Sequence, residues 1–123
     1  MDEAMMVAGI GCRRGVDAAE VIAAVAAARA AHAAIALDTL ATLKRDEPAL
    51  AEAALRLGLP LLVVAPVDDA RLLTRSDASR AATGAGSASE AAALAAAGAG
   101  ARLLGPRLAV GRVTCAIATR DEP

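Results

Sequence analysis

Hydrophobic and polar positions fall along the chain in blocks that predict alternating strands and helices. Residues 5–10 form an apolar run that ends at glycines and reads as a buried strand. Asp17 and Glu20 then have the spacing of a helical capping box, with the helix continuing to about His32. Apolar residues at every second position over 34–43 predict a second strand.

The middle of the chain repeats the pattern of helix and strand. A helix is expected to begin near Pro48 and to end at Gly58. Residues 59–65 are a continuous apolar run rich in branched side chains, which predicts a third strand covered on both faces by helices. Residues 67–80 are polar and are expected to form a connecting loop, with a short helical turn at 68–73.

The last part of the chain predicts one more helix and a pair of short strands. Ser87 and Glu90 have capping-box spacing, and alanines carry the helix to Gly98. Apolar runs at 101–104 and 112–118 are joined by too short a link for a crossover helix, so the last strand should be antiparallel. We therefore expect an α/β fold, a three-layer α/β/α sandwich with a mixed, mostly parallel sheet of about five strands and an antiparallel C-terminal strand.

Composition restricts the class of protein. The 123 residues fit a single domain over 1–123, with residues 1–4 and 119–123 expected to be frayed tails. The chain has no aromatic residue and a net charge of -1, so nucleic acid is not an expected partner. The acidic start and the lack of a long apolar run argue against a membrane span, and we expect a cytoplasmic protein. Whether it forms a homo-oligomer stays open.

The cysteines and basic residues limit the chemistry. Cys12 and Cys115 lie far apart and His32 is the only histidine, so neither a disulfide framework nor a metal site is indicated, and no cofactor is expected. Lys44 is the only lysine among the basic side chains. The planar guanidinium of arginine suits two-pronged binding of carboxylate or phosphate.

The first glycine-rich turn follows the first predicted strand and precedes the first predicted helix. Sheets of this class place their ligands at such a position, where free backbone N–H groups and the helix dipole favour anions. The candidate ligand-binding residues of this turn are Gly9, Gly11, Cys12, Arg13, Arg14 and Gly15. A tight turn with solvated arginines explains the same residues, and Cys12 with a lowered pKa could instead be a nucleophile.

Charged residues follow the second predicted strand and, if the strands are parallel, lie beside the first turn. The candidates are Lys44, Arg45 and Glu47. The alternative is that Asp46 or Glu47 caps the next helix while the basic pair is solvated.

A second glycine-rich helix start could face the same cleft. Its candidates are Thr83, Gly84, Ser87 and Glu90, and Glu90 is either a general acid or base or simply a capping residue. Near the end of the chain, Arg107 and Arg112 flank the terminal hairpin, either solvated or clamping a carboxylate.

Four segments resemble a known family in both order and content. They are "GIGCRRGV", "ATLKRDEPAL", "TGAGSASEAAALAAAG" and "LLGPRLAVGRVTCAIA". Their order is that of the CobE family, which is similar to the C-terminal domain of CbiG, and the first and third segments are the specific ones. Arg107 stands where the family usually has lysine, and whether Lys44 or Arg45 replaces the lysine of the second segment stays open.

The resemblance implies a three-layer α/β domain that acts in cobalamin biosynthesis on precorrin or corrinoid intermediates, which carry many carboxylate arms. Three roles stay open: binding such an intermediate, catalysing hydrolysis or rearrangement of a precorrin lactone, and docking on a precorrin methyltransferase. A catalytic role would use Glu90, Glu47 or Cys12. The resemblance does not itself imply enzymatic activity.

Overall fold

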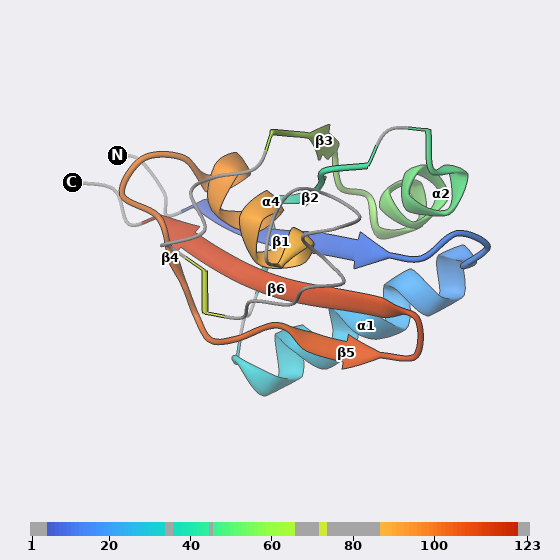
Figure 1. The fold of residues 1–123 in the computed structure, drawn as a ribbon, viewed down its shortest axis with the longest axis horizontal. Helices are drawn as coiled ribbons and strands as arrows, with labels where there is room; N and C mark the ends of the chain where they lie inside the picture. The colour runs from blue at the N-terminus through green and yellow to red at the C-terminus, as the bar shows by residue number, and fades with distance from the viewer. Residues whose placement is uncertain (1–4, 34–35, 45, 66–71, 74–86, 121–123) are drawn as a thin grey trace.

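A computed structural model of the protein describes residues 5–33, 36–44, 46–65, 72–73 and 87–120. Figure 1 shows the arrangement of its strands and helices. In chain order these are β1 (Met5–Cys12), α1 (Ala18–Ala31), β2 (Thr39–Thr42), α2 (Pro48–Leu57), β3 (Leu61–Val63), α4 (Ala88–Ala97), β4 (Arg102–Leu103), β5 (Leu108–Val110) and β6 (Val113–Arg120). No helix within these ranges combines the length and apolarity that a bilayer crossing requires.

The strands form one mixed sheet in the order β3-β2-β1-β6-β4, with β5 also paired to β6. Strands β1, β2 and β3 are parallel neighbours, whereas β6 runs antiparallel to β1, β4 and β5. Figure 1 shows β1 and β6 side by side with opposite directions. The α/β class, the mixed sheet and the antiparallel last strand are confirmed.

Local capping signals explain where the helices begin and end. Asp17 and Glu20 form the predicted capping box at the start of α1. Helix α2 has Pro48 in its first turn and ends at Gly58, whose φ of 71° is the left-handed conformation that glycine adopts easily. These boundaries agree with those expected from the sequence.

Two hydrophobic clusters lie on opposite faces of the sheet and define the three layers. One joins α1 and α2 to one face, with Ile10, Leu40 and Ile117 among its buried residues. The other joins α4 to the opposite face through a cluster that includes Val7 and Leu94. Successive side chains of β1 therefore pack into the clusters on opposite faces of the sheet, because side chains alternate between the two faces along a strand.

Gly9 allows α4 to pack directly on β1. A Cβ atom at this position would lie 2.0 Å from the carbonyl oxygen of Ser89 and 2.5 Å from the backbone nitrogen of Ala93. Such distances are far below van der Waals contact, so a side chain here would push the helix away from the sheet. The glycine is therefore required for packing.

The third strand differs from expectation. Strand β3 covers Leu61–Val63 and pairs only with β2 in the described sheet, at its edge. Leu62 and Val63 are 42% and 47% exposed, so the strand is not covered on both faces. An apolar run is consistent with a buried strand, but it does not show where the strand lies in the sheet.

The C-terminal region also differs in detail. Strands β4 and β5 pair with successive lengths of the same edge of β6, interrupted near Gly105 and Pro106, so the described sheet has six strands rather than about five. All three antiparallel pairings involve β6, and the other five described strands run in one direction, as expected of a mostly parallel sheet with an antiparallel C-terminal strand. Strand β6 includes Thr119 and Arg120, which were expected to fray.

Other expectations differ in extent or lie outside the described residues. Strand β2 is shorter than the run expected over 34–43. The loop and helical turn expected between residues 67 and 80 fall, apart from Leu72 and Leu73, outside the described residues.

We predict that Gly9→Ala destabilises the protein by about 3 kcal/mol, because the added methyl group overlaps the backbone of α4. Urea unfolding monitored by circular dichroism measures the change. Gly58→Ala is the control, since its Cβ meets nothing within 4 Å and only the left-handed backbone is strained. A Gly9→Ala protein no less stable than the Gly58→Ala protein would contradict the packing role.

Candidate functional site

Two turns meet at the C-terminal ends of the parallel strands β1 and β2. The parallel register pairs Val7 with Thr39 and Ile10 with Thr42, so both strands end on the same side of the sheet. The Lys44 ammonium group donates a 2.7 Å hydrogen bond to the carbonyl oxygen of Cys12. This bond ties the turn after β2 to the turn after β1 and confirms that the first two charged segments are neighbours.

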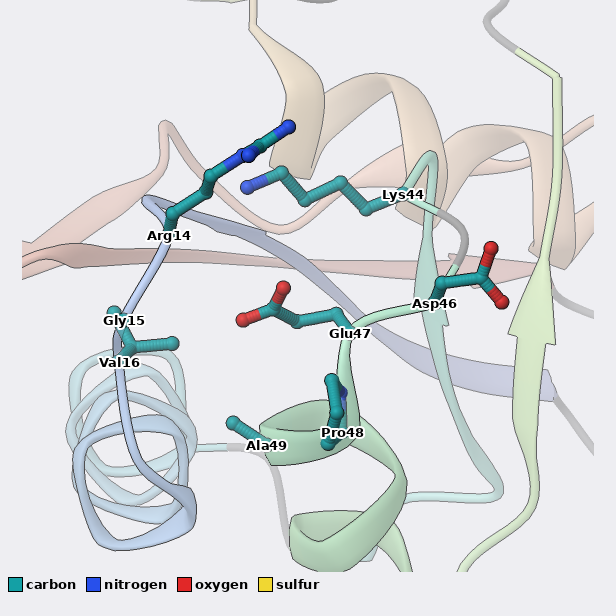
Figure 2. Close-up of a pocket in the computed structure, with 8 residues that line it drawn as sticks. All are labelled: Arg14, Gly15, Val16, Lys44, Asp46, Glu47, Pro48 and Ala49. Atoms are coloured by element: carbon teal, nitrogen blue, oxygen red, sulfur yellow. The ribbon is translucent and has the colours of Figure 1, made fainter.

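An open pocket of about 710 Å³ lies between these turns. It is lined by Arg14, Gly15, Val16, Lys44, Asp46, Glu47, Pro48 and Ala49. Figure 2 shows the side chains of Arg14 and Lys44 extending toward one another, while the Glu47 carboxylate points into the space below them. Asp46 is turned away from that space.

The helix starts surround this edge of the sheet. Gly15, with a φ of 84°, and Val16 lead into α1, while Glu47 and Pro48 begin α2. Helix α4 begins beside β1 on the opposite face, since a Cβ at Gly11 would lie 3.5 Å from the Cβ of Ala88. The starts of α1 and α4 therefore lie at one edge of the sheet, as the anion-site hypothesis requires, although no described residue of α4 lines this pocket.

Glu47 occupies the N-cap position of α2, but its side chain makes no capping hydrogen bond. Glu47 was therefore correctly expected at the N-cap position. The expectation that its side chain caps the helix by a hydrogen bond was wrong. The carboxylate stays directed into the pocket, where Lys44 and Arg14 are the nearby cations shown in Figure 2.

The first glycine-rich segment divides into packing residues and pocket residues. Gly9 serves the contact with α4, and a Cβ at Gly11 would lie 2.7 Å from the Thr114 hydroxyl oxygen. Arg14 and Gly15 line the pocket, whereas Arg13 is exposed outside its lining. Close packing therefore explains why Gly9 and Gly11 are glycines, without any role in ligand binding.

Burial works against Cys12 as a nucleophile. Desolvation raises the pKa of its half-buried thiol, the positive charge of Lys44 lowers it, and Glu47 raises it, with a net increase. This is the opposite of the lowered pKa that the nucleophile hypothesis needs. The buried thiol of Cys115 has its pKa raised to about 12 by desolvation.

Glu90 connects three parts of the chain. Its backbone N–H donates to the Ser87 hydroxyl oxygen at 3.4 Å, which confirms the serine as the N-cap of α4. Its fully buried carboxylate accepts the Leu73 N–H at 2.8 Å and the Arg107 N–H at 2.9 Å. The carboxylate thus reaches beyond its own helix to Leu73 and Arg107, a role that capping-box spacing does not reveal.

Arg112 clamps an internal carboxylate. Its guanidinium donates to both oxygens of Glu20, at 3.1 and 2.5 Å, and to the carbonyl oxygen of Gly15 at 3.1 Å. The hydrogen bonds from Arg112 to the Glu20 carboxylate, together with the one from the Asp17 N–H, lower the pKa of Glu20. Arg112 therefore joins the β5–β6 turn to the start of α1, and the carboxylate that it binds belongs to this chain rather than to a ligand.

The pocket thus brings together four of the candidates, Arg14, Gly15, Lys44 and Glu47. The candidates Gly9, Gly11, Cys12, Arg13, Ser87, Glu90 and Arg107 do not line it. Arg45, Thr83 and Gly84 lie outside the described residues. Val16, Asp46, Pro48 and Ala49 were missed as lining residues, and their positions at or next to helix starts were the available signal.

Possible metal ligands are not grouped in this part of the chain. Within the described ranges, no set of three histidine, cysteine, aspartate or glutamate residues is arranged to hold a metal ion.

Comparison with known proteins identifies the family. The family described as "Cobalamin synthesis G C-terminus" matches residues 6–118. The chain belongs to this family. The match begins one residue into β1 and ends two residues before the end of β6, so it includes strands β2 to β5, the described helices and both turns of the pocket.

Two solved structures of cobalamin-biosynthesis proteins resemble this family member closely. CobE, from the cobalamin (vitamin B12) biosynthetic pathway, is 36% identical with a TM-score of 0.86, over 98% of this chain and 94% of CobE. The cobalamin biosynthesis protein chiG from Agrobacterium tumefaciens str. C58 is 47% identical with a TM-score of 0.71, over 96% of this chain and 100% of chiG. The search of curated proteins finds no match. The chain is thus a protein of cobalamin biosynthesis.

We predict that Glu90→Ala destabilises the protein by about 2 to 4 kcal/mol, because two backbone N–H groups lose their acceptor and a cavity is left. Glu90→Gln should cost less, since the amide oxygen still accepts one of the two hydrogen bonds. Urea unfolding of both variants measures the difference. Stabilities of both variants within about 0.5 kcal/mol of the parent would show that these bonds do not hold the segments.

The clamp on Glu20 should make stability depend on pH. A carboxyl group whose pKa is lowered on folding stabilises the protein above its unfolded pKa of about 4.3, and this contribution is lost as the pH falls through the folded value. Arg112→Ala should therefore lower Tm most near pH 7, with a smaller difference near pH 3.

Thermal unfolding at low ionic strength, with Arg14→Ala as a control of equal charge change, tests this pH dependence. An Arg112→Ala difference in Tm that is the same at both pH values would contradict the carboxylate clamp.

Proposed function

We propose that this protein binds a polycarboxylate precorrin or corrinoid intermediate, with carboxylate arms entering the pocket at Arg14 and Lys44. The observation that carries the proposal is the convergence of these two cationic side chains over one open pocket, shown in Figure 2. Family membership supports the pathway, and the charges support the chemical class of ligand.

The two cations can interact with carboxylates in different ways. The exposed guanidinium of Arg14 can present two parallel N–H donors to a carboxylate. Lys44 carries three N–H donors, one of which is directed to the Cys12 carbonyl, so its position is held by the hydrogen bond while further donors remain. The dipoles of the helices that start here add to the attraction for anions.

The shape of the pocket suits the arms of a large ligand. It is open to solvent and lies at the surface between two turns, so an acetate or propionate arm can enter while most of a macrocycle stays outside. Specificity for a carboxylate-rich ligand then comes from several charge-assisted hydrogen bonds at once, each of which is weakened by salt.

Glu47 supports a second candidate function, hydrolysis or rearrangement of a precorrin lactone. Its carboxylate points into the pocket and is not used to cap α2. A carboxylate beside a bound ester can act as a general base toward water. Of the three catalytic candidates, Glu47 alone has its side chain in this pocket.

We predict that Arg14→Ala weakens binding of hydrogenobyrinic acid about tenfold, because a charge-assisted hydrogen bond is lost. Lys44→Ala should weaken binding similarly, with Tm measured alongside because the variant also loses the bond to Cys12. Titration followed by visible absorbance gives Kd. Arg29→Ala, in the last turn of α1, is the control of equal charge change.

Glu47→Gln separates binding from catalysis. It removes a negative charge beside the carboxylate arms, so the binding function predicts affinity equal to or tighter than that of the parent. Loss of conversion of a lactone-bearing intermediate, with binding retained, would favour the enzymatic function. Equal affinities for the parent, Arg14→Ala and Lys44→Ala proteins would contradict the proposed site.

A further inference from the structure

A second hollow, of about 320 Å³, continues from the pocket along α2 and β3. It shares Lys44, Asp46, Glu47 and Pro48 with the pocket. Beyond these shared residues its lining is apolar and consists of Leu50, Ala51, Leu61 and Val63. The charged pocket and the apolar groove therefore meet at the start of α2.

The groove has an exposed apolar floor because β3 lies at the edge of the sheet. Leu61 packs against the cluster beneath α1 and α2, and Val63, two residues further on, lies on the same face of the strand. Val63 is 47% exposed, and Ala51 is exposed on the neighbouring helix. Single exposed apolar residues are ordinary, but these lie together and adjoin a charged pocket.

The junction of charge and apolar surface defines the kind of molecule that fits both hollows. A small polycarboxylate would interact with Arg14 and Lys44 but leave the groove hydrated. A wholly apolar ligand would cover Val63 without matching the cations. A molecule with carboxylate arms on an apolar ring presents both kinds of surface, so it can interact with the cations and with the apolar lining at the same time.

We propose that the pocket and the groove form one two-part site, in which carboxylate arms bind at Arg14 and Lys44 while an apolar ring edge of the same ligand lies on Val63, Leu61 and Ala51. This inference rests on the function proposed above and adds the orientation of the ligand. It makes Val63 and Ala51 specificity residues, which distinguish a macrocycle from other polycarboxylates.

Two probes separate the parts of the site. Hydrogenobyrinic acid carries carboxylates on an apolar macrocycle, and 1,2,3,4-butanetetracarboxylate carries carboxylates without a ring. Val63→Ser should raise Kd for hydrogenobyrinic acid about three- to tenfold, because less apolar surface is buried. The Kd of the Val63→Ser protein for the tetracarboxylate, measured by calorimetry, should stay within about twofold of the parent value.

Ala51→Glu provides an independent variant, since it adds a carboxylate to the groove and should weaken binding of hydrogenobyrinic acid more than Val63→Ser does. Leu55→Ser is the matched control, because Leu55 is 82% exposed on α2 and lines neither hollow. It should leave both affinities unchanged. Circular dichroism establishes that each variant is folded.

The possible outcomes separate this inference from the proposed function. Binding of hydrogenobyrinic acid that depends on Arg14 but not on Val63 or Ala51 would overturn the two-part site and leave the proposed function intact. Absence of binding by the parent protein would overturn both. If Val63→Ser instead converts an oligomer to a monomer in analytical ultracentrifugation without changing Kd, the groove is an interface between copies and the inference is wrong.

Discussion

The parallel pairing of β1 with β2 is the constraint on which the candidate site depends. Because both strands end at one edge, the turn containing Arg14 and the turn containing Lys44 and Glu47 become neighbours although they lie far apart in sequence. The hydrogen bond from Lys44 to the Cys12 carbonyl then fixes the two turns to each other. A shift in this register would separate the cations and remove the pocket.

The surrounding contacts hold that edge in place from both faces of the sheet. On one face, Arg112 binds Glu20 and the Gly15 carbonyl, which secures the start of α1 beside the pocket. On the other face, Gly9 lets α4 lie against β1, and Glu90 joins that helix to the segments at Leu73 and Arg107. Several conspicuous residues of the sequence motifs therefore support the fold, and fewer of them face the pocket.

Local signals predicted much of this structure, and long-range contacts account for most of the differences. The caps at Asp17 and Ser87 and the stop at Gly58 are encoded by neighbouring residues, so the helix boundaries were accessible from the sequence. The edge position of β3 depends on what pairs with it, which an apolar run does not specify. Likewise, the partner of Arg112 lies 92 residues away, and Glu90 binds backbone groups 17 residues away in both directions.

Within the candidate site, the neighbouring position of the two charged turns followed from parallel topology, but the direction of each side chain did not. Glu47 and Asp46 are adjacent, yet one points into the pocket and the other away from it. A crystal structure of the protein with hydrogenobyrinic acid tests the proposed site most directly. We expect ligand carboxylates within hydrogen-bonding distance of the Arg14 guanidinium and the Lys44 ammonium group; a corrinoid bound elsewhere, with both cations facing solvent, would contradict the proposed site.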